Sequence, residues 1–254
     1  MHYQMWIWSK FENVIAHFLI AMMEELIILY YVLFYMFLLM YYHYNNIISY
    51  KEVAYMGKIK LLHGSDHIIE KPDLLLGKTN NDYGRGFYCT QELSMAMEWA
   101  CKKNSDGFVN KYVLEQDSLN ILNLLDGKYN ILHWMALLLK NRTFRLSNEI
   151  AIDACDYIIE NFSIDLKAYD VIIGYRADDS YFSFAESFVQ NGLPLRSLNE
   201  ALHLGRLGTQ TVLISEKSFR NLTFDGADFA DKTVYYPKFI ARDSNVRETY
   251  RDRK

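Results

Sequence analysis

The chain has 254 residues, of which 51% are hydrophobic and 23% are charged, so it can bury a core and is not intrinsically disordered. Its formal net charge of −4 excludes the general positive field that is typical of nucleic-acid-binding proteins. The three cysteines, Cys89, Cys101 and Cys155, have no metal-ligand spacing, and their odd number argues against a disulfide framework. We therefore expect a cytoplasmic protein with one main domain, an appendage and no bound metal.

The first predicted elements lie in an apolar segment over residues 1–55. Residues 26–42 run for 17 positions without a charge, which is the lower limit for a helix that crosses a bilayer. The run contains five tyrosines and lacks the basic flank that sets the orientation of a membrane span. We therefore favour a helical hairpin, roughly over residues 11–29 and 33–44, that packs on the main domain or on a partner. Membrane anchoring through residues 26–42 is the alternative.

A change in composition at residues 55–57 predicts the start of a second domain over residues 56–254. Its first segment, Lys58–Ser65, alternates as a short strand. This strand ends in His63, which is followed by a flexible glycine and a serine. A polar side chain is therefore expected at the end of a strand, where a ligand can reach it.

Residues 80–90 combine turn-forming residues with two glycines and lead into a second short strand over residues 87–89. The later elements follow from periodicity and from turn residues. We predict helices over residues 91–103, 129–142, 147–162, 179–192 and 197–205, strands over 111–115, 169–175, 209–215 and 232–243, and a strand or turn over 118–124. Because the strands and helices lack a regular βαβ rhythm, the predicted fold class is α+β.

Four segments carry a further pattern: LLHGSDHIIEKPDL (61–74), NNDYGRGFYCTQELSMAMEWA (80–100), YDVIIGYRADDSYF (169–182) and LHLGRLGTQTVLISEKSF (202–219). In order and spacing they resemble an uncharacterised bacterial family assigned to the ADP-ribosyltransferase superfamily, over residues 58–250. The resemblance implies an ADP-ribosyltransferase-like split β-sheet core with surrounding helices, preceded here by the N-terminal helical hairpin. It also implies a His-Tyr-Glu type of pocket that binds NAD as a substrate.

The resemblance assigns roles to individual residues of this pocket. His63 would bond the ribose hydroxyl next to adenine, and the backbone of Gly64 would contact the nicotinamide amide. Tyr88 would stack on the nicotinamide ring. Ser65, beside Gly64, and Arg85, which can reach the pyrophosphate from the glycine-rich turn, complete the expected NAD-binding set.

The third catalytic position departs from the family pattern. Cleavage of the bond between nicotinamide and ribose passes through an oxocarbenium-like state, which a carboxylate stabilises. The family glutamate sits at the head of a late strand, and that position is Thr209 or Gln210 here. Gln210 can bond a ribose hydroxyl, but a neutral amide supplies no charge. Asp178 or Asp179, before the next helix, would be another source of a carboxylate.

These residues predict NAD-dependent transfer of ADP-ribose to a macromolecular acceptor, as in a bacterial toxin or conflict effector. The segment over residues 1–55 would then be regulatory, or would bind an antitoxin or another helical partner. The alternative is a catalytically degenerate module that binds NAD, a nucleotide or a partner protein. The third position, residue 209 or 210, distinguishes the two hypotheses, because only the first requires it to act in catalysis.

Overall fold

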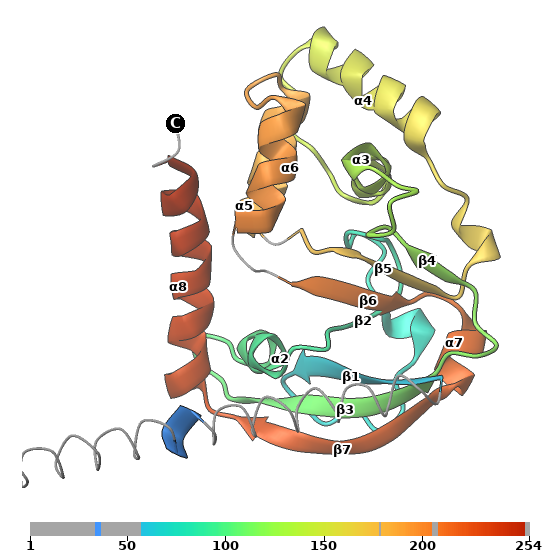
Figure 1. Cartoon of the computed structure of the whole chain (residues 1–254), viewed down its shortest axis with the longest axis vertical. Helices are drawn as coiled ribbons and strands as arrows, with labels where there is room; N and C mark the ends of the chain where they lie inside the picture. Colours follow the sequence, from blue (N-terminus) through green and yellow to red (C-terminus); the bar gives the residue numbers. More distant parts are fainter. Residues whose placement is uncertain (1–33, 37–56, 178, 205–207, 252–254) are drawn as a thin grey trace, which may run out of the picture. The chain divides into compact units, whose positions relative to one another are not determined.

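The computed structural model describes residues 34–36, 57–177, 179–204 and 208–251 (Figure 1). The chain divides after Met56 into two units, and the fold described below lies in the second, Gly57–Lys254. Of the first unit, only the helical residues Phe34–Met36 are described. The predicted hairpin over residues 11–29 and 33–44 otherwise lies outside the described residues. Among the described residues, no helix has the length and apolar character needed to cross a membrane.

The second unit contains strands and helices in mixed order. The strands are β1 (Lys58–Ser65), β2 (Phe87–Cys89), β3 (Gly107–Glu115), β4 (Ile121–Asn123), β5 (Val171–Tyr175), β6 (Thr209–Leu213) and β7 (Leu222–Ala230). The helices are α2 (Leu93–Ala100), α3 (Ile131–Asn141), α4 (Glu149–Phe162), α5 (Asp179–Val189), α6 (Leu195–Leu204), α7 (Glu216–Arg220) and α8 (Lys232–Arg251), with 3₁₀ turns η1 (Leu74–Leu76) and η2 (Leu166–Ala168). The predicted α+β class is confirmed.

The strands form two sheets. The first is antiparallel with the order β1-β3-β7, and the second has the order β2-β6-β5-β4, in which only β4 and β5 are parallel. A backbone bridge joins the sheets, because Leu62 and Thr90 exchange two N–H···O bonds of 2.8 Å. Apolar side chains of both sheets, such as Leu61 and Leu213, share one core cluster beside this bridge.

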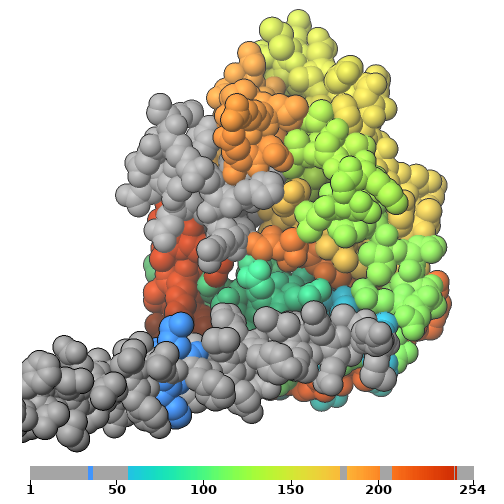
Figure 2. Space-filling model, viewed as in Figure 1, coloured from blue at the N-terminus to red at the C-terminus, as the bar shows by residue number. Residues whose placement is uncertain are grey.

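Helices cover each sheet on one side (Figure 1). On the second sheet lies α3, whose Trp134 and Leu138 pack in one core cluster with Ile172 and Val212 of that sheet. Side chains of α4, α5 and α6 join this cluster, and these helices form the upper surface in Figure 2. On the first sheet, α2 lies between β1 and α8.

The C-terminal part of the fold differs from the sequence prediction. Residues 232–243 were expected to form a strand, but they belong to helix α8. The helix begins after Asp231, whose carboxylate accepts hydrogen bonds from the backbone N–H and the hydroxyl of Thr233. The final strand is β7, which the prediction missed because Asp225 and Gly226 suggest a turn. These two residues instead form a bulge, where β7 advances by one residue more than β3.

Candidate functional site

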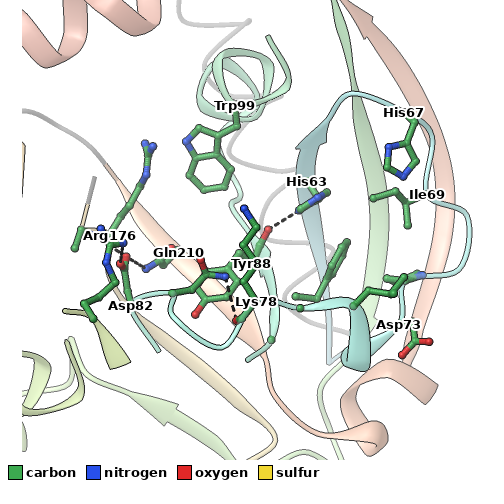
Figure 3. A pocket seen from close by; sticks show the side chains of 18 of the residues that line it. His63, His67, Ile69, Asp73, Lys78, Asp82, Tyr88, Trp99, Arg176 and Gln210 are labelled. Carbon is green, nitrogen blue, oxygen red and sulfur yellow. Dashed lines mark hydrogen bonds and ion pairs between the residues drawn. The ribbon is translucent and has the colours of Figure 1, made fainter. Parts of the chain in front are cut away.

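A cavity of about 760 Å³ is lined by residues from both sheets and from the helices α2 and α8 (Figure 3). Its lining brings together the three expected catalytic residues, which lie on β1, β2 and β6. The lining residues that matter for its chemistry are His63, Asp82, Tyr88, Trp99, Arg142, Arg176, Gln210, Phe239 and Ile240. A cavity of this size falls within the usual range for small-molecule sites, roughly 300–1,000 Å³.

His63 lies one residue beyond the bridge that joins the sheets. Its Nδ1 is 2.7 Å from the carbonyl oxygen of Tyr88, so Nδ1 carries the proton and donates this bond. Burial lowers the pKa of His63 below its ordinary value, and the Tyr88 bond opposes this shift only in part. The ring is therefore neutral at physiological pH. In this tautomer Nε2 is the hydrogen-bond acceptor of the ring.

Tyr88 forms a rigid wall of the cavity. Its hydroxyl donates to the carbonyl oxygen of Gly84 at 2.7 Å and accepts the backbone N–H of Tyr83 at 3.0 Å. Burial raises the pKa of this hydroxyl well above its ordinary value. Because its hydroxyl is held by two hydrogen bonds, the ring can present a fixed, flat face to a ligand. Because its pKa is raised, the phenol stays protonated at neutral pH.

Gln210 lies at the second position of β6, opposite Gly174 of β5, and is 3% exposed. Its Nε2 donates to Oδ2 of Asp82 at 3.0 Å and to the carbonyl oxygen of Tyr175 at 3.2 Å. Both N–H groups of the amide are thus bonded to protein acceptors. Gln210 also belongs to the cavity lining, so its side chain borders the space that a ligand would occupy.

Asp82 is a buried carboxylate in the lining that was not among the site residues expected from the sequence. It is 6% exposed and accepts hydrogen bonds from Arg142, from the backbone N–H of Ala177 and from Gln210. Burial raises the pKa of Asp82, whereas these three donors and the nearby Arg176 act in the opposite direction. Its signal in the sequence was its place in the same turn as Tyr88, but an Asn-Asn-Asp run resembles an ordinary turn.

Two arginines bring positive charge to the same part of the cavity. Nη1 of Arg142, just after α3, lies 2.9 Å from Oδ1 of Asp82. Arg176, which follows β5, places its guanidinium 4.6 Å from the ring centroid of Trp99 (Figure 3). The indole Nε1 of Trp99 is buried and has no hydrogen-bond partner among the described residues.

Three expected NAD-binding residues lie outside the cavity lining. Gly64 packs against α2, where an added Cβ would meet the carbonyl oxygen of Ala96 at 2.2 Å. The hydroxyl of Ser65 bonds the carbonyl oxygen of His67 and accepts from Asn110. Arg85 is exposed. The contacts of Gly64 and Ser65 are thus with the protein itself: Gly64 faces α2, and Ser65 bonds the loop after β1 and Asn110 of β3.

The two other residues that were expected as a possible source of the catalytic carboxylate are Asp178 and Asp179. Asp178 is outside the described residues, and Asp179 is the first residue of α5. Glu216 is exposed at the start of α7, 3.6 Å from Arg220, and is not in the lining. Within the described ranges, no group of three or more His, Cys, Asp or Glu side chains could hold a metal ion.

Comparison with known proteins gives one match. A family model described as "Protein of unknown function (DUF3990)" matches residues 59–224. No curated protein and no solved structure matches the chain. The matched segment covers well over half of the sequence and contains His63, Asp82, Tyr88 and Gln210 of the cavity. The chain therefore belongs to the DUF3990 family.

Proposed function

We propose that this protein transfers ADP-ribose from NAD to a macromolecular acceptor, and that its second unit has an ADP-ribosyltransferase-like core. One observation carries the proposal. His63, Tyr88 and Gln210 are far apart in the sequence, and the resemblance alone assigned them to one NAD pocket. They line the same cavity, on β1, β2 and β6.

The chemistry of the lining suits NAD as a substrate. Nε2 of the neutral His63 can accept a hydrogen bond from a ribose hydroxyl, and the fixed ring of Tyr88 can stack on nicotinamide. Arg142 and Arg176 supply positive charge for the pyrophosphate. Lys78, on the exposed loop that follows η1, adds a further cation at the rim.

The transfer itself requires no redox step. The bond between C1′ of the ribose and the nicotinamide nitrogen breaks, and its electron pair neutralises the pyridinium ring. The ribose is left as an oxocarbenium-like cation. A nucleophilic O–H, N–H or S–H group of the acceptor then forms the new bond to C1′ and releases its proton to solvent. The protein contributes orientation and electrostatic stabilisation.

The second candidate is a binding module without turnover. It is favoured by the amide at position 210, both of whose N–H groups are bonded to protein acceptors. Such a module would bind NAD or a nucleotide in the same cavity and act through a partner. Both candidates require His63 and Tyr88, so variants of these residues test the pocket and not the turnover.

Incubation of the purified full-length chain with labelled NAD and bacterial extract separates the two candidates. The transferase hypothesis predicts label on a macromolecule and release of nicotinamide. NAD binding without either product would support the binding module. Absence of NAD binding would refute the transferase and a module that binds NAD. His63→Ala and Tyr88→Ala should abolish binding or turnover. Tyr157→Ala is the matched control, because Tyr157 is exposed on α4, away from the cavity lining.

The apolar residues 1–55 would serve as a regulatory or partner-binding segment, for example for an antitoxin. Partition of the full chain between membrane and soluble fractions tests this proposal against membrane anchoring through residues 26–42. Recovery in the soluble fraction without detergent supports partner binding, and recovery only in the membrane fraction supports the anchor.

A further inference from the structure

The cavity contains a carboxylate close to the position where this chain has Gln210 in place of the family glutamate. Among the described residues, the lining holds two acidic ones, Asp73 and Asp82. Asp73 is exposed, and its Oδ1 caps η1 through the N–H of Leu75. Asp82 is buried and lies beside Gln210 and Tyr88 (Figure 3). Asp82 is thus the lining acid that is near both the aromatic wall and the third catalytic position.

Three donors hold the Asp82 carboxylate in one orientation. Oδ2 accepts the N–H of Ala177 at 2.8 Å and the amide of Gln210 at 3.0 Å. Oδ1 accepts Nη1 of Arg142 at 2.9 Å. A carboxylate oxygen can accept two hydrogen bonds, so Oδ1 retains acceptor capacity while Oδ2 is fully used. The carboxylate is therefore oriented before any ligand binds, and its Oδ1 can accept a further hydrogen bond from a ligand.

At the third catalytic position, this chain has an amide in place of the family carboxylate, and that amide is bonded to a second carboxylate, Asp82. A glutamate at position 210 would place its carboxylate about where the Gln210 amide now donates to Asp82. The amide is the correct partner for a carboxylate, because an N–H donor stabilises the ionised acid next to it. Gln210 and Asp82 therefore form a complementary pair. In this pair the carboxylate lies in the turn before β2, whereas in the family pattern it lies on the strand that corresponds to β6.

We propose that Asp82 is the catalytic carboxylate of this site and that Gln210 is its positioning residue. The proposal rests on the transferase function above. Oδ1 of Asp82 would stabilise the positive charge that develops on the ribose when the bond to nicotinamide breaks. The guanidinium of Arg142 pairs with the same carboxylate and holds it in place, and it favours the ionised form against the effect of burial. The bonds made and broken are those of the transfer described above, and Asp82 forms no covalent bond.

The first test is Asp82→Asn, which keeps the size of the side chain and removes its charge. NAD should bind with an affinity within about threefold of the wild type, while the rate of nicotinamide release should fall by about 100-fold or more. Glu216→Gln is the matched control, since it makes the same acid-to-amide change on the exposed surface of α7. Release within about threefold of the wild-type rate in Asp82→Asn would overturn the proposal.

The second test is Gln210→Glu, which restores the family residue. If the chain had merely lost its catalytic glutamate, this variant would be faster than the wild type. Our proposal predicts a slower variant, because a second carboxylate about 3 Å from Oδ2 of Asp82 forces the pair to share a proton. A rate above that of the wild type would overturn the proposal even if Asp82→Asn failed to fold.

The positioning role of Gln210 has its own readout. Gln210→Leu removes the donor to Asp82, so the pKa of Asp82 should rise and the acidic limb of the rate profile should move to higher pH. Among the described residues, the other charged or titratable groups that act on Asp82 or respond to it are Arg142, Arg176, Tyr83 and Tyr88, and burial raises the pKa of both tyrosines. A lower rate with an unmoved acidic limb would show a purely structural role.

These tests are separable from the test of the function. If the wild-type chain releases no nicotinamide, the transferase function fails and this proposal fails with it. If the wild type is active and Asp82→Asn is equally active, only the present proposal fails.

Discussion

The contact between Gly64 and α2 predicts a large effect for a small substitution. A Cβ at position 64 would lie 2.2 Å from the carbonyl oxygen of Ala96, 2.6 Å from the backbone nitrogen of Ala100 and 2.9 Å from Cβ of Trp99. Ordinary contacts of a Cβ begin at 3.4 Å, so α2 must move by about 1 Å in Gly64→Ala. The obstructing atoms include backbone, which cannot rotate away.

Overpacking of this kind costs about 1–3 kcal/mol, and we expect a value near 2 kcal/mol or above. With a urea m-value of about 2 kcal/mol/M, the midpoint of unfolding should fall by about 1 M. Equilibrium urea unfolding followed by far-ultraviolet circular dichroism measures this shift. Since α2 carries Trp99 into the cavity, ligand affinity should fall as well.

Gly127→Ala provides the matched control, because a Cβ there meets no atom within 4 Å. Its urea midpoint should equal or slightly exceed that of the wild type. Equal midpoints for Gly64→Ala and Gly127→Ala would refute the argument, and would mean that β1 and α2 are not packed as closely as described.

Two further predictions concern charge. Burial lowers the pKa of His63 below 6.5, so the unfolded chain binds more protons than the folded one as the pH falls through about 6.5. The free energy of unfolding should therefore decrease from about pH 7.5 to 5.5, and less steeply in His63→Leu; parallel urea midpoints for the two proteins would contradict this. Arg242→Ala leaves the carboxylate of Glu98, which is 4% exposed, without the partner that lies 2.6 Å away. We expect the free energy of unfolding, measured with urea or heat, to fall by about 3 kcal/mol. This value is at the lower end of the range for breaking a buried ion pair, because the Arg242 side chain is 22% exposed. Arg220→Ala, which breaks the exposed pair with Glu216, should cost less than about 1 kcal/mol, and equal losses in the two variants would disprove the role of burial.

Local patterns in the sequence were sufficient for the early part of the fold. The alternation in β1, the glycine-rich turn before β2 and the helical period of α3 and α4 are signals carried within each segment. The prediction for residues 232–243 was wrong because aromatic and β-branched residues favour a strand, whereas the Asp231 cap and packing on α2 favour a helix.

The site was predictable only where one residue and its immediate neighbours carried the signal. His63 precedes a glycine near the end of β1, Tyr88 follows the glycine-rich turn before β2, and Gln210 followed from the resemblance. Asp82 and Arg142 are 60 positions apart, and their pairing depends on how α3 packs against the turn before β2. No local period or motif encodes such a contact, so these residues emerge only from the three-dimensional arrangement.

Helix α8 has a consequence for the evolution and the dissection of this protein. It contributes Phe239 and Ile240 to the cavity, yet the family match ends at residue 224, before the helix begins. Relatives can therefore share the strands that carry His63 and Gln210 while they differ in one wall of the cavity. A chain cut at residue 224 would also lose most of β7 and would uncover the buried Glu98. Residues 59–224 alone thus lack most of β7 and all of α8, which both belong to the fold described above.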